Sequence, residues 1–484
     1  MKPTRRDLAL SSFLGFLSHL QVTETQAAEA NHLRDGLLLQ LQANGIRHSA
    51  KQSKLYTGEL SPGCATCGAG TWSCAYLTKQ CTAACFFCPS EPGSDGSLPR
   101  ANRISMPGLE TYIAFLRFFR FRGVAFSGGE PLLAFEDLVT WITRIKQEFG
   151  DGIYLWVYTN GDLVDQDKLQ ALHHAGLDEI RINIRARDYQ LAPISLARKF
   201  IQTVTVEIPT IPEEVETLKE QIVDLHRLGV DHLNLHQLFA NQVNYRSLAE
   251  RSYTFLPLVG TASPVLESEI TALRLLLFAL ENQIDLPINY CSLVYRTRYD
   301  ELAHRRRAAS LSKRDHDTVA ETGLLRRLSI GGPPGHIRRI HAALEADGHS
   351  SALWRVTDDG TSLIFHPTLL ASSQLQREMV NLEYYVAELH DGGAAPTDQS
   401  GSSMQVHIGP DLDLRVEERL ASTPVTLPGA ELAACLASAA AAEPPVAGTA
   451  SMNPCPGPLH SAEQMPRGLQ KIVEAGSLLE TVAE

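Results

Sequence analysis

The sequence predicts an α/β fold, in which strand–helix units build a partial (β/α)6 barrel of the TIM type. Short apolar runs alternate with amphipathic runs of helical length between residues 75 and 281. Polar residues follow several of the strand-like runs. Strands joined by helices in this way lie parallel, so their carboxyl ends meet at one edge, where such barrels carry out their chemistry.

Each element is predicted from its own pattern. The strands are apolar runs of four to six residues, and the helices carry apolar residues at three- and four-residue spacing. Gly150, Gly176 and Gly229 stand where helices are expected to end. In chain order, the expected strands are 75–78, 123–126, 154–158, 179–184, 204–208 and 233–238, and the expected helices are 108–119, 134–149, 165–174, 194–202, 213–228 and 269–281.

Shifts in composition divide the 484 residues into regions, and this length suits two or three domains. The last region is dominated by Ala, Pro, Gly and Ser, which is typical of a linker or disordered segment. The expected regions are 1–60 (N-terminal extension), 61–75 (cysteine-rich segment), 76–290 (partial barrel), 291–430 (C-terminal region with an arginine-rich segment and a small domain) and 431–484 (low-complexity tail).

Composition excludes several classes of protein. Hydrophobic residues make up 44% and charged residues 20%, which indicates a globular protein rather than a disordered or collagenous one. The formal charge of −12 repels phosphate backbones, so a nucleic acid is not expected as a partner. No apolar run reaches the ~18 residues of a membrane span, so no membrane partner is expected either.

Cysteines carry the strongest chemical signal. The chain has nine, and the six between Cys64 and Cys88 indicate metal ligation rather than a disulfide framework. Cys81, Cys85 and Cys88 have the spacing C-x3-C-x2-C, which suits three corners of a 4Fe–4S cluster whose fourth iron has no protein ligand. A structural zinc loop is the alternative. The predicted second strand ends in Ser127-Gly128-Gly129-Glu130-Pro131, which would lie beside these cysteines.

These two motifs, in this order, resemble those of the radical S-adenosylmethionine (SAM) superfamily, over residues 75–240. The resemblance implies that the three cysteines hold the cluster and that the open iron chelates the amino and carboxylate groups of SAM. It implies that Gly128, Gly129 and Glu130 receive the methionine ammonium and that the backbone at Phe87 contacts adenine. Reductive cleavage of SAM would yield a 5′-deoxyadenosyl radical, which abstracts a hydrogen atom from the substrate.

Polar residues at the ends of the third and fourth predicted strands are further candidates for binding SAM. Their position on the barrel, rather than any motif, places Thr159, Asn160, Asn183 and Arg185 near its ribose or carboxylate. Each could equally be an ordinary turn or strand residue.

A second set of cysteines flanks the barrel: Cys64, Cys67, Cys74 and Cys291. The hypothesis is an auxiliary iron–sulfur cluster, and structural zinc or no metal are the alternatives. A Gly-Cys-x2-Cys before the cluster loop and the Cys-x3-Tyr ending at Tyr295 resemble a radical SAM group related to pyruvate formate-lyase activating enzymes. That resemblance implies architecture and little about the substrate.

The leading expectation for the substrate is a peptide or protein residue, modified by cross-linking, epimerisation or oxidation. Modification of a small metabolite or RNA by the same chemistry is a second possibility, with Arg305, Arg306 and Arg307 contacting an anion. A non-catalytic iron–sulfur or zinc protein is the third.

Residues 1–30 resemble a twin-arginine export signal. Arg5 and Arg6 precede a modestly apolar run, and Ala28-Glu29-Ala30 has the form of a cleavage site. An amphipathic N-terminal helix, or a start codon placed too early, is the alternative. Because radical SAM chemistry needs a strong intracellular reductant, of flavodoxin or ferredoxin type, we expect a cytoplasmic protein.

Overall fold

The computed structural model describes residues 5–18, 24–50, 52–90, 93, 99–392, 403–409, 411–421 and 423–441. Most of the expected low-complexity tail, including Cys455, lies outside these ranges. The chain divides into two compact units, one formed by residues 1–304 and 407–413 and the other by 305–406 and 414–484.

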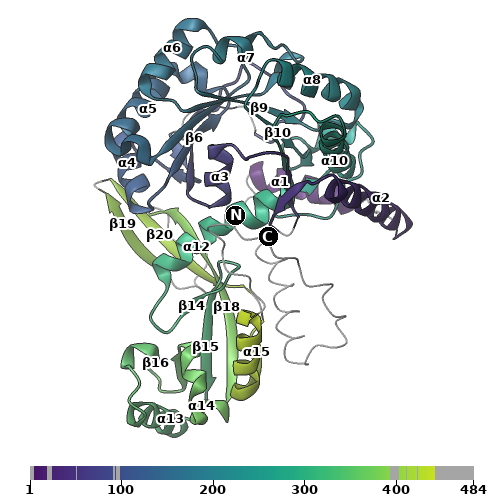
Figure 1. The fold of residues 1–484 in the computed structure, drawn as a ribbon. Coiled ribbons are helices and arrows are strands. Elements are labelled where there is room, and N and C mark those ends of the chain that lie inside the picture. Colours follow the sequence, from purple (N-terminus) through teal and green to yellow (C-terminus); the bar gives the residue numbers. More distant parts are fainter. Residues whose placement is uncertain are drawn as a thin grey trace. The chain divides into compact units, whose positions relative to one another are not determined.

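The first unit is built on an open barrel of parallel strands (Figure 1). In the described residues the parallel strands are hydrogen-bonded in the order β3-β6-β7-β8-β9-β10-β13. Antiparallel β2 (Lys54–Tyr56) and β1 (Arg47–Ser49) extend the β13 edge, and β4 (Arg100–Ala101) and β5 (Ile104–Ser105) extend the β3 edge. The parallel strands are β3 (Trp72–Thr78), β6 (Gly123–Gly128), β7 (Tyr154–Thr159), β8 (Glu179–Ile182), β9 (Thr203–Pro209), β10 (His232–His236) and β13 (Ile288–Cys291).

The expected fold class is confirmed, with one parallel strand more than expected. Strand β13 follows the last predicted helix and pairs with β10. It was missed because it has four residues and alternates apolar Ile288 and Tyr290 with polar Asn289, so it does not form an apolar run. The helices between the strands are α4 (Leu109–Phe118), α5 (Phe135–Phe149), α6 (Gln166–Ala175), α7 (Ala192–Ala197), α8 (Val215–Arg227) and α10 (Leu266–Glu281).

Local sequence explains where these helices begin and end. The Asp165 side chain accepts a hydrogen bond from the Lys168 amide at the start of α6, and Gly176 ends that helix in the left-handed conformation with φ 94°. Helix α7 stops at Ala197, five residues before the expected end, and the chain turns there into β9.

The cysteine-rich segment forms a short helix inside the barrel. Figure 1 shows α3 (Pro62–Gly68) within the arc of strands, where it contacts β6 and β7. The Ser61 hydroxyl caps this helix and also accepts a hydrogen bond from the Arg181 guanidinium at 3.0 Å. A Cβ on Gly63 would lie 2.3 Å from that guanidinium and 2.9 Å from Glu179, so only glycine fits against these buried charges.

Overpacking at this contact should destabilise the barrel. Gly63→Ala is expected to lower the free energy of unfolding by roughly 1–3 kcal/mol, because Arg181 has to shift away from its carboxylate partners. Urea denaturation followed by circular dichroism measures the change. Gly36→Ala is the matched control, since a Cβ there meets nothing within 4 Å and alanine is the better helix former. Equal stability of the two variants would contradict the tight fit of α3.

The N-terminal segment packs on the first unit. Helix α1 (Arg5–Ser18) buries Phe13 completely in an apolar cluster, and Phe13 and Phe16 both contact the Tyr245 ring. Helix α2 (Glu24–Ala43) packs on α10 and includes the cleavage-like Ala28–Ala30. None of the helices in the described part of the chain is long and apolar enough to cross a membrane.

The second unit is built on an antiparallel sheet with strand order β16-β17-β15-β18-β20-β19, to which β14 and β21 are added at β15 and β18. Helices α13 (Pro334–Ala346) and α15 (Gly429–Ala441) contribute to its apolar core. Helix α15 occupies residues that composition assigned to the low-complexity tail. The strands are β14 (Thr318–Val319), β15 (Leu325–Gly331), β16 (Trp354–Val356), β17 (Ser362–Phe365), β18 (Met379–Asp391), β19 (Ser403–Gly409), β20 (Leu412–Leu420) and β21 (Val425–Pro428).

Candidate active site

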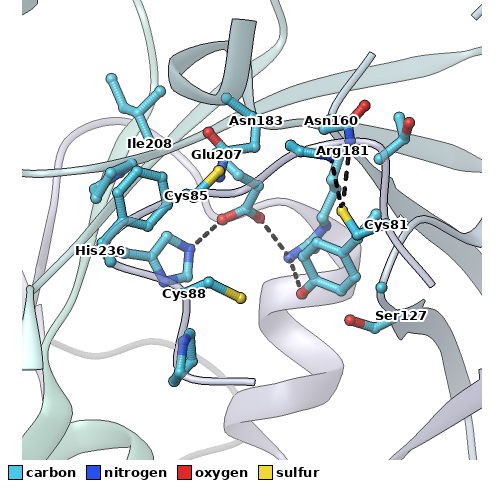
Figure 2. Close-up of a pocket in the computed structure, with 18 of the residues that line it drawn as sticks. Cys81, Cys85, Cys88, Ser127, Asn160, Arg181, Asn183, Glu207, Ile208 and His236 are labelled. Carbon is cyan, nitrogen blue, oxygen red and sulfur yellow. Dashed lines mark hydrogen bonds and ion pairs between the residues drawn. The ribbon is translucent and has the colours of Figure 1, made fainter. Parts of the chain in front are cut away.

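A cavity of about 280 Å³ lies at the carboxyl ends of the parallel strands, and it brings together residues that are far apart in sequence. Three cysteines from the loop after β3 face residues from the ends of β6 to β10 across it (Figure 2). Of the residues proposed for binding the cluster and SAM, those lining the cavity are Cys81, Cys85, Phe87, Cys88, Gly128, Gly129, Thr159, Asn160 and Asn183.

The cysteine loop has almost no regular structure of its own and is held by neighbouring side chains. The Asn244 side-chain amide donates to the Phe87 carbonyl at 3.0 Å, and the Asn241 amide donates to the Pro89 carbonyl at 3.0 Å. The guanidinium of Arg251 lies 3.7 Å from the centroid of the Phe86 ring. Because these contacts fix the backbone between and after the last two cysteines, they orient the thiols toward the cavity.

Electrostatics at Cys85 and Cys88 disfavours thiolates without a bound cation. Burial, followed by the neighbouring Cys88 and Cys81, raises the pKa of Cys85 to about 11, while Arg185 opposes the rise. Burial also raises the pKa of Cys88, against a backbone hydrogen bond at Ser90. Thiolates at this site therefore need compensation by metal, which an iron–sulfur cluster supplies.

The donor set fits a 4Fe–4S cluster. A cubane places each thiolate on a different iron, so its ligands surround it without meeting at one point. Three thiols around one cavity, with no fourth Cys in the cavity lining, match that requirement.

The glycines after β6 allow a close backbone approach. Gly128 has φ 128°, and a Cβ on Gly129 would lie 1.9 Å from the carbonyl oxygen of Gln80. The amide of Gly129 donates to the Thr78 carbonyl at 2.9 Å. The glycine turn is thereby hydrogen-bonded to the start of the cysteine loop, and both glycines face the cavity.

Glu130 differs from expectation, because its side chain is fully buried and does not line the cavity. Its carboxylate accepts hydrogen bonds from the Thr159 hydroxyl at 2.8 Å, from the backbone amide of Asn160 at 2.7 Å and from the backbone amide of Leu132 at 3.1 Å. Burial raises the pKa of Glu130, and these three bonds oppose the rise. In this arrangement Glu130 positions the end of β7.

Two of the remaining strand-end candidates are placed differently. Asn183 lines the cavity, and its buried Oδ1 has no hydrogen-bond partner in the described part of the chain, so an acceptor is left open for a ligand donor. Arg185 does not line the cavity, and its guanidinium is paired with Glu214 at 2.8 Å. Asn160 donates to the Thr82 hydroxyl at 2.9 Å and lies 3.7 Å from the Cys81 sulfur.

Sequence reasoning missed a charged network in the barrel interior (Figure 2). The Glu207 carboxylate accepts hydrogen bonds from the Arg181 guanidinium at 3.1 Å and from the Asn234 side-chain amide at 2.7 Å, and it pairs with His236. Although burial opposes ionisation, His236, Arg181 and Asn234 lower the pKa of Glu207 overall. A glutamate inside the apolar run 203–209 was the available signal, because an inward-facing charge in a buried strand needs a partner.

This network should make stability depend on acid pH. A carboxyl whose pKa is lowered by folding stabilises the protein above its unfolded pKa, and that contribution is lost as the pH falls through the folded value. The wild type should therefore lose stability below about pH 4.5 more steeply than Glu207→Gln. Urea unfolding between pH 3 and pH 7 measures this slope. Equal slopes in the two proteins would show that Glu207 does not titrate in this way.

The second cysteine set is carried by three elements of the first unit. Cys64 is buried with its sulfur 3.5 Å from the Asn234 side chain and 3.7 Å from the Asn289 side-chain amide. Cys67 is at the end of α3, Cys74 is on β3, and Cys291 ends β13 opposite Lys54. Cys64 raises the pKa of Cys291 electrostatically. The auxiliary cluster stays a prediction.

Comparison with known proteins agrees with this geometry. The Radical SAM superfamily model matches residues 76–200. Over 286 residues, 56% of this chain and 73% of the relative, the chain is 30% identical to a Methanocaldococcus jannaschii protein provisionally named a glycyl-radical enzyme activating enzyme. It is also 32% identical to the GTP 3′,8-cyclase of Aquifex aeolicus over 111 residues, which span 23% of this chain and 33% of that enzyme.

Solved structures give weaker matches. Streptococcus suis SuiB bound to SAM aligns with a TM-score of 0.30 and 13% identity, over 47% of this chain and 49% of SuiB. Coproporphyrinogen III oxidase from Escherichia coli aligns with a TM-score of 0.30 and 12% identity, over 46% of this chain and 56% of that enzyme.

The chain belongs to the radical SAM superfamily. It is an enzyme whose cofactors are a 4Fe–4S cluster and SAM.

Proposed function

We propose that this enzyme activates a protein partner by abstracting a hydrogen atom from a backbone glycine, which leaves a stored glycyl radical. The observation that carries the proposal is the similarity to the M. jannaschii relative, which extends over 73% of that protein and so goes beyond the cysteine motif. The cavity supports it, since a three-cysteine loop and the strand ends that would contact SAM share one space.

Different residues of the chain have different roles in this proposed reaction. Cys81, Cys85 and Cys88 hold the cluster, which when reduced supplies the electron that cleaves SAM. Gly128 and Gly129 expose backbone to the methionine part of SAM, and Asn183 offers its unpartnered oxygen to a hydroxyl or amino donor. A low-potential flavodoxin or ferredoxin is the proposed reductant.

The test is direct formation of the protein radical. The anaerobically reconstituted enzyme, with dithionite and SAM, is mixed with candidate glycyl-radical enzymes from the same genome. We expect a doublet electron paramagnetic resonance signal on one partner and 5′-deoxyadenosine in equal amount. If SAM is cleaved but no candidate acquires a radical, while a peptide or metabolite is modified instead, the substrate proposal is wrong and the radical SAM assignment stands.

A further inference from the structure

Arg296 is a cation of the cavity wall, and no carboxylate of the described residues pairs with it. It follows β13 and lines the cavity, with its guanidinium 5.1 Å from the centroid of the Phe239 ring. The other arginine of the cavity wall is compensated, because Arg181 pairs with both Glu179 and Glu207. Across the described residues, Arg296 has no carboxylate within 4 Å. The Arg296 guanidinium is therefore available to an anionic ligand.

Lys54 is a second cation that no described carboxylate pairs with, and it is more deeply buried than Arg296. Its side chain is only 2% exposed, and its ammonium is 4.1 Å from the centroid of the Tyr295 ring. No carboxylate of the described chain comes within 4 Å of it. A contact with an aromatic face compensates a buried ammonium only in part, so the site favours an additional anion.

The charges of Lys54 and Arg296 both act on the thiol of Cys291. On β13 it is paired with Lys54 of β2 on one side and with His236 of β10 on the other. Burial raises the pKa of its thiol, and Lys54 and then Arg296 oppose the rise. The residue is partly exposed, and its strand partner His236 lines the cavity.

We propose that Arg296, Lys54 and Cys291 form an anion subsite that binds a carboxylate of the substrate. The planar guanidinium can receive both carboxylate oxygens, and Lys54 adds charge from behind. The inference rests on the proposed function, which makes the substrate that carries this carboxylate a protein. The carboxylate would belong to an acidic side chain near the target glycine. The subsite itself requires no radical chemistry, so it can be tested without a partner protein.

Selective alkylation tests the subsite. The cluster-loaded, unreduced enzyme with saturating SAM is treated with iodoacetate or iodoacetamide, and mass spectrometry measures the rate of alkylation at Cys291. Glutathione in the same tube is the reference thiol. Because iodoacetate carries a carboxylate, its rate relative to iodoacetamide should be about tenfold higher at Cys291 than at glutathione. Malonate should slow the reaction, and malonamide should not.

Two variants identify the groups responsible. Arg296→Gln and Lys54→Met should each bring the iodoacetate preference to within about twofold of glutathione. Arg227→Gln, an exposed arginine of α8 paired with Asp224, should keep the wild-type preference.

Three results would overturn the inference. The first is a preference equal to that of glutathione in the wild type. The second is a preference that exists only without SAM, which would assign the subsite to the carboxylate of SAM. The third is failure of both reagents to reach Cys291. None of these results bears on whether a glycyl radical forms, so the two proposals fail separately.

Discussion

Cys85→Ala should abolish reductive cleavage of SAM. Without this thiol the cluster keeps two of its three protein ligands, so it is lost or degraded and no longer presents a single open iron. We expect at least a ~10³-fold decrease in the rate of 5′-deoxyadenosine formation, because the electron for cleavage comes from this cluster. Iron and sulfide per chain, measured after anaerobic reconstitution, should fall in parallel.

The matched control is Cys435→Ala. Cys435 is a buried cysteine of α15 in the second unit, and the cavity does not include it. This variant should keep wild-type iron content and SAM cleavage. Retention of a full cluster by Cys85→Ala would show that the loop does not supply the ligands.

Glu130→Gln should weaken SAM binding while leaving the cluster in place. A carboxamide can accept through only one of its two polar atoms, so a buried amide at Leu132 or Asn160 loses its acceptor, at a cost of about 1–3 kcal/mol in stability. The end of β7 then shifts, and Thr159 and Asn160 line the cavity from that end. A misplacement of about 1 Å near the reacting groups can lower a reaction rate by about 10²-fold.

The measurements separate positioning from general destabilisation. Iron content and the thermal midpoint are recorded together with the Kd for SAM, and the Kd should rise by about tenfold or more at a temperature where the variant is folded. Glu136→Gln, on the first turn of α5, should change neither iron content nor Kd. An unchanged Kd in Glu130→Gln would mean that this carboxylate serves stability alone.

The fold could be predicted because its main signals are local. Alternating apolar strands and amphipathic helices locate six strands of the parallel barrel, and Gly150 and Gly176 do end their helices. Strand β13 was missed because Asn289 faces the barrel interior, where its partners come from β10 and from α3. Polarity inside the barrel removes the apolar pattern on which strand prediction depends.

The candidate site was predictable only where a motif carried it. The cysteine motif and the glycine turn are each one continuous stretch of sequence. They identified residues that share one cavity in the structure. The pairing of Glu207 with His236 joins two strands, and the tethers from Asn241 and Asn244 cross more than 150 residues. Such contacts depend on sheet register and loop path, which residue spacing does not encode.

The most direct test of this account is whether SAM binds to one open iron of a cluster held by Cys81, Cys85 and Cys88. Electron–nuclear double resonance on the reduced enzyme with SAM labelled with ¹⁵N in its amino group measures this contact. The account predicts a ¹⁵N hyperfine coupling to the cluster that disappears when the label is omitted. A fully loaded, reduced cluster with saturating SAM and no such coupling would contradict it.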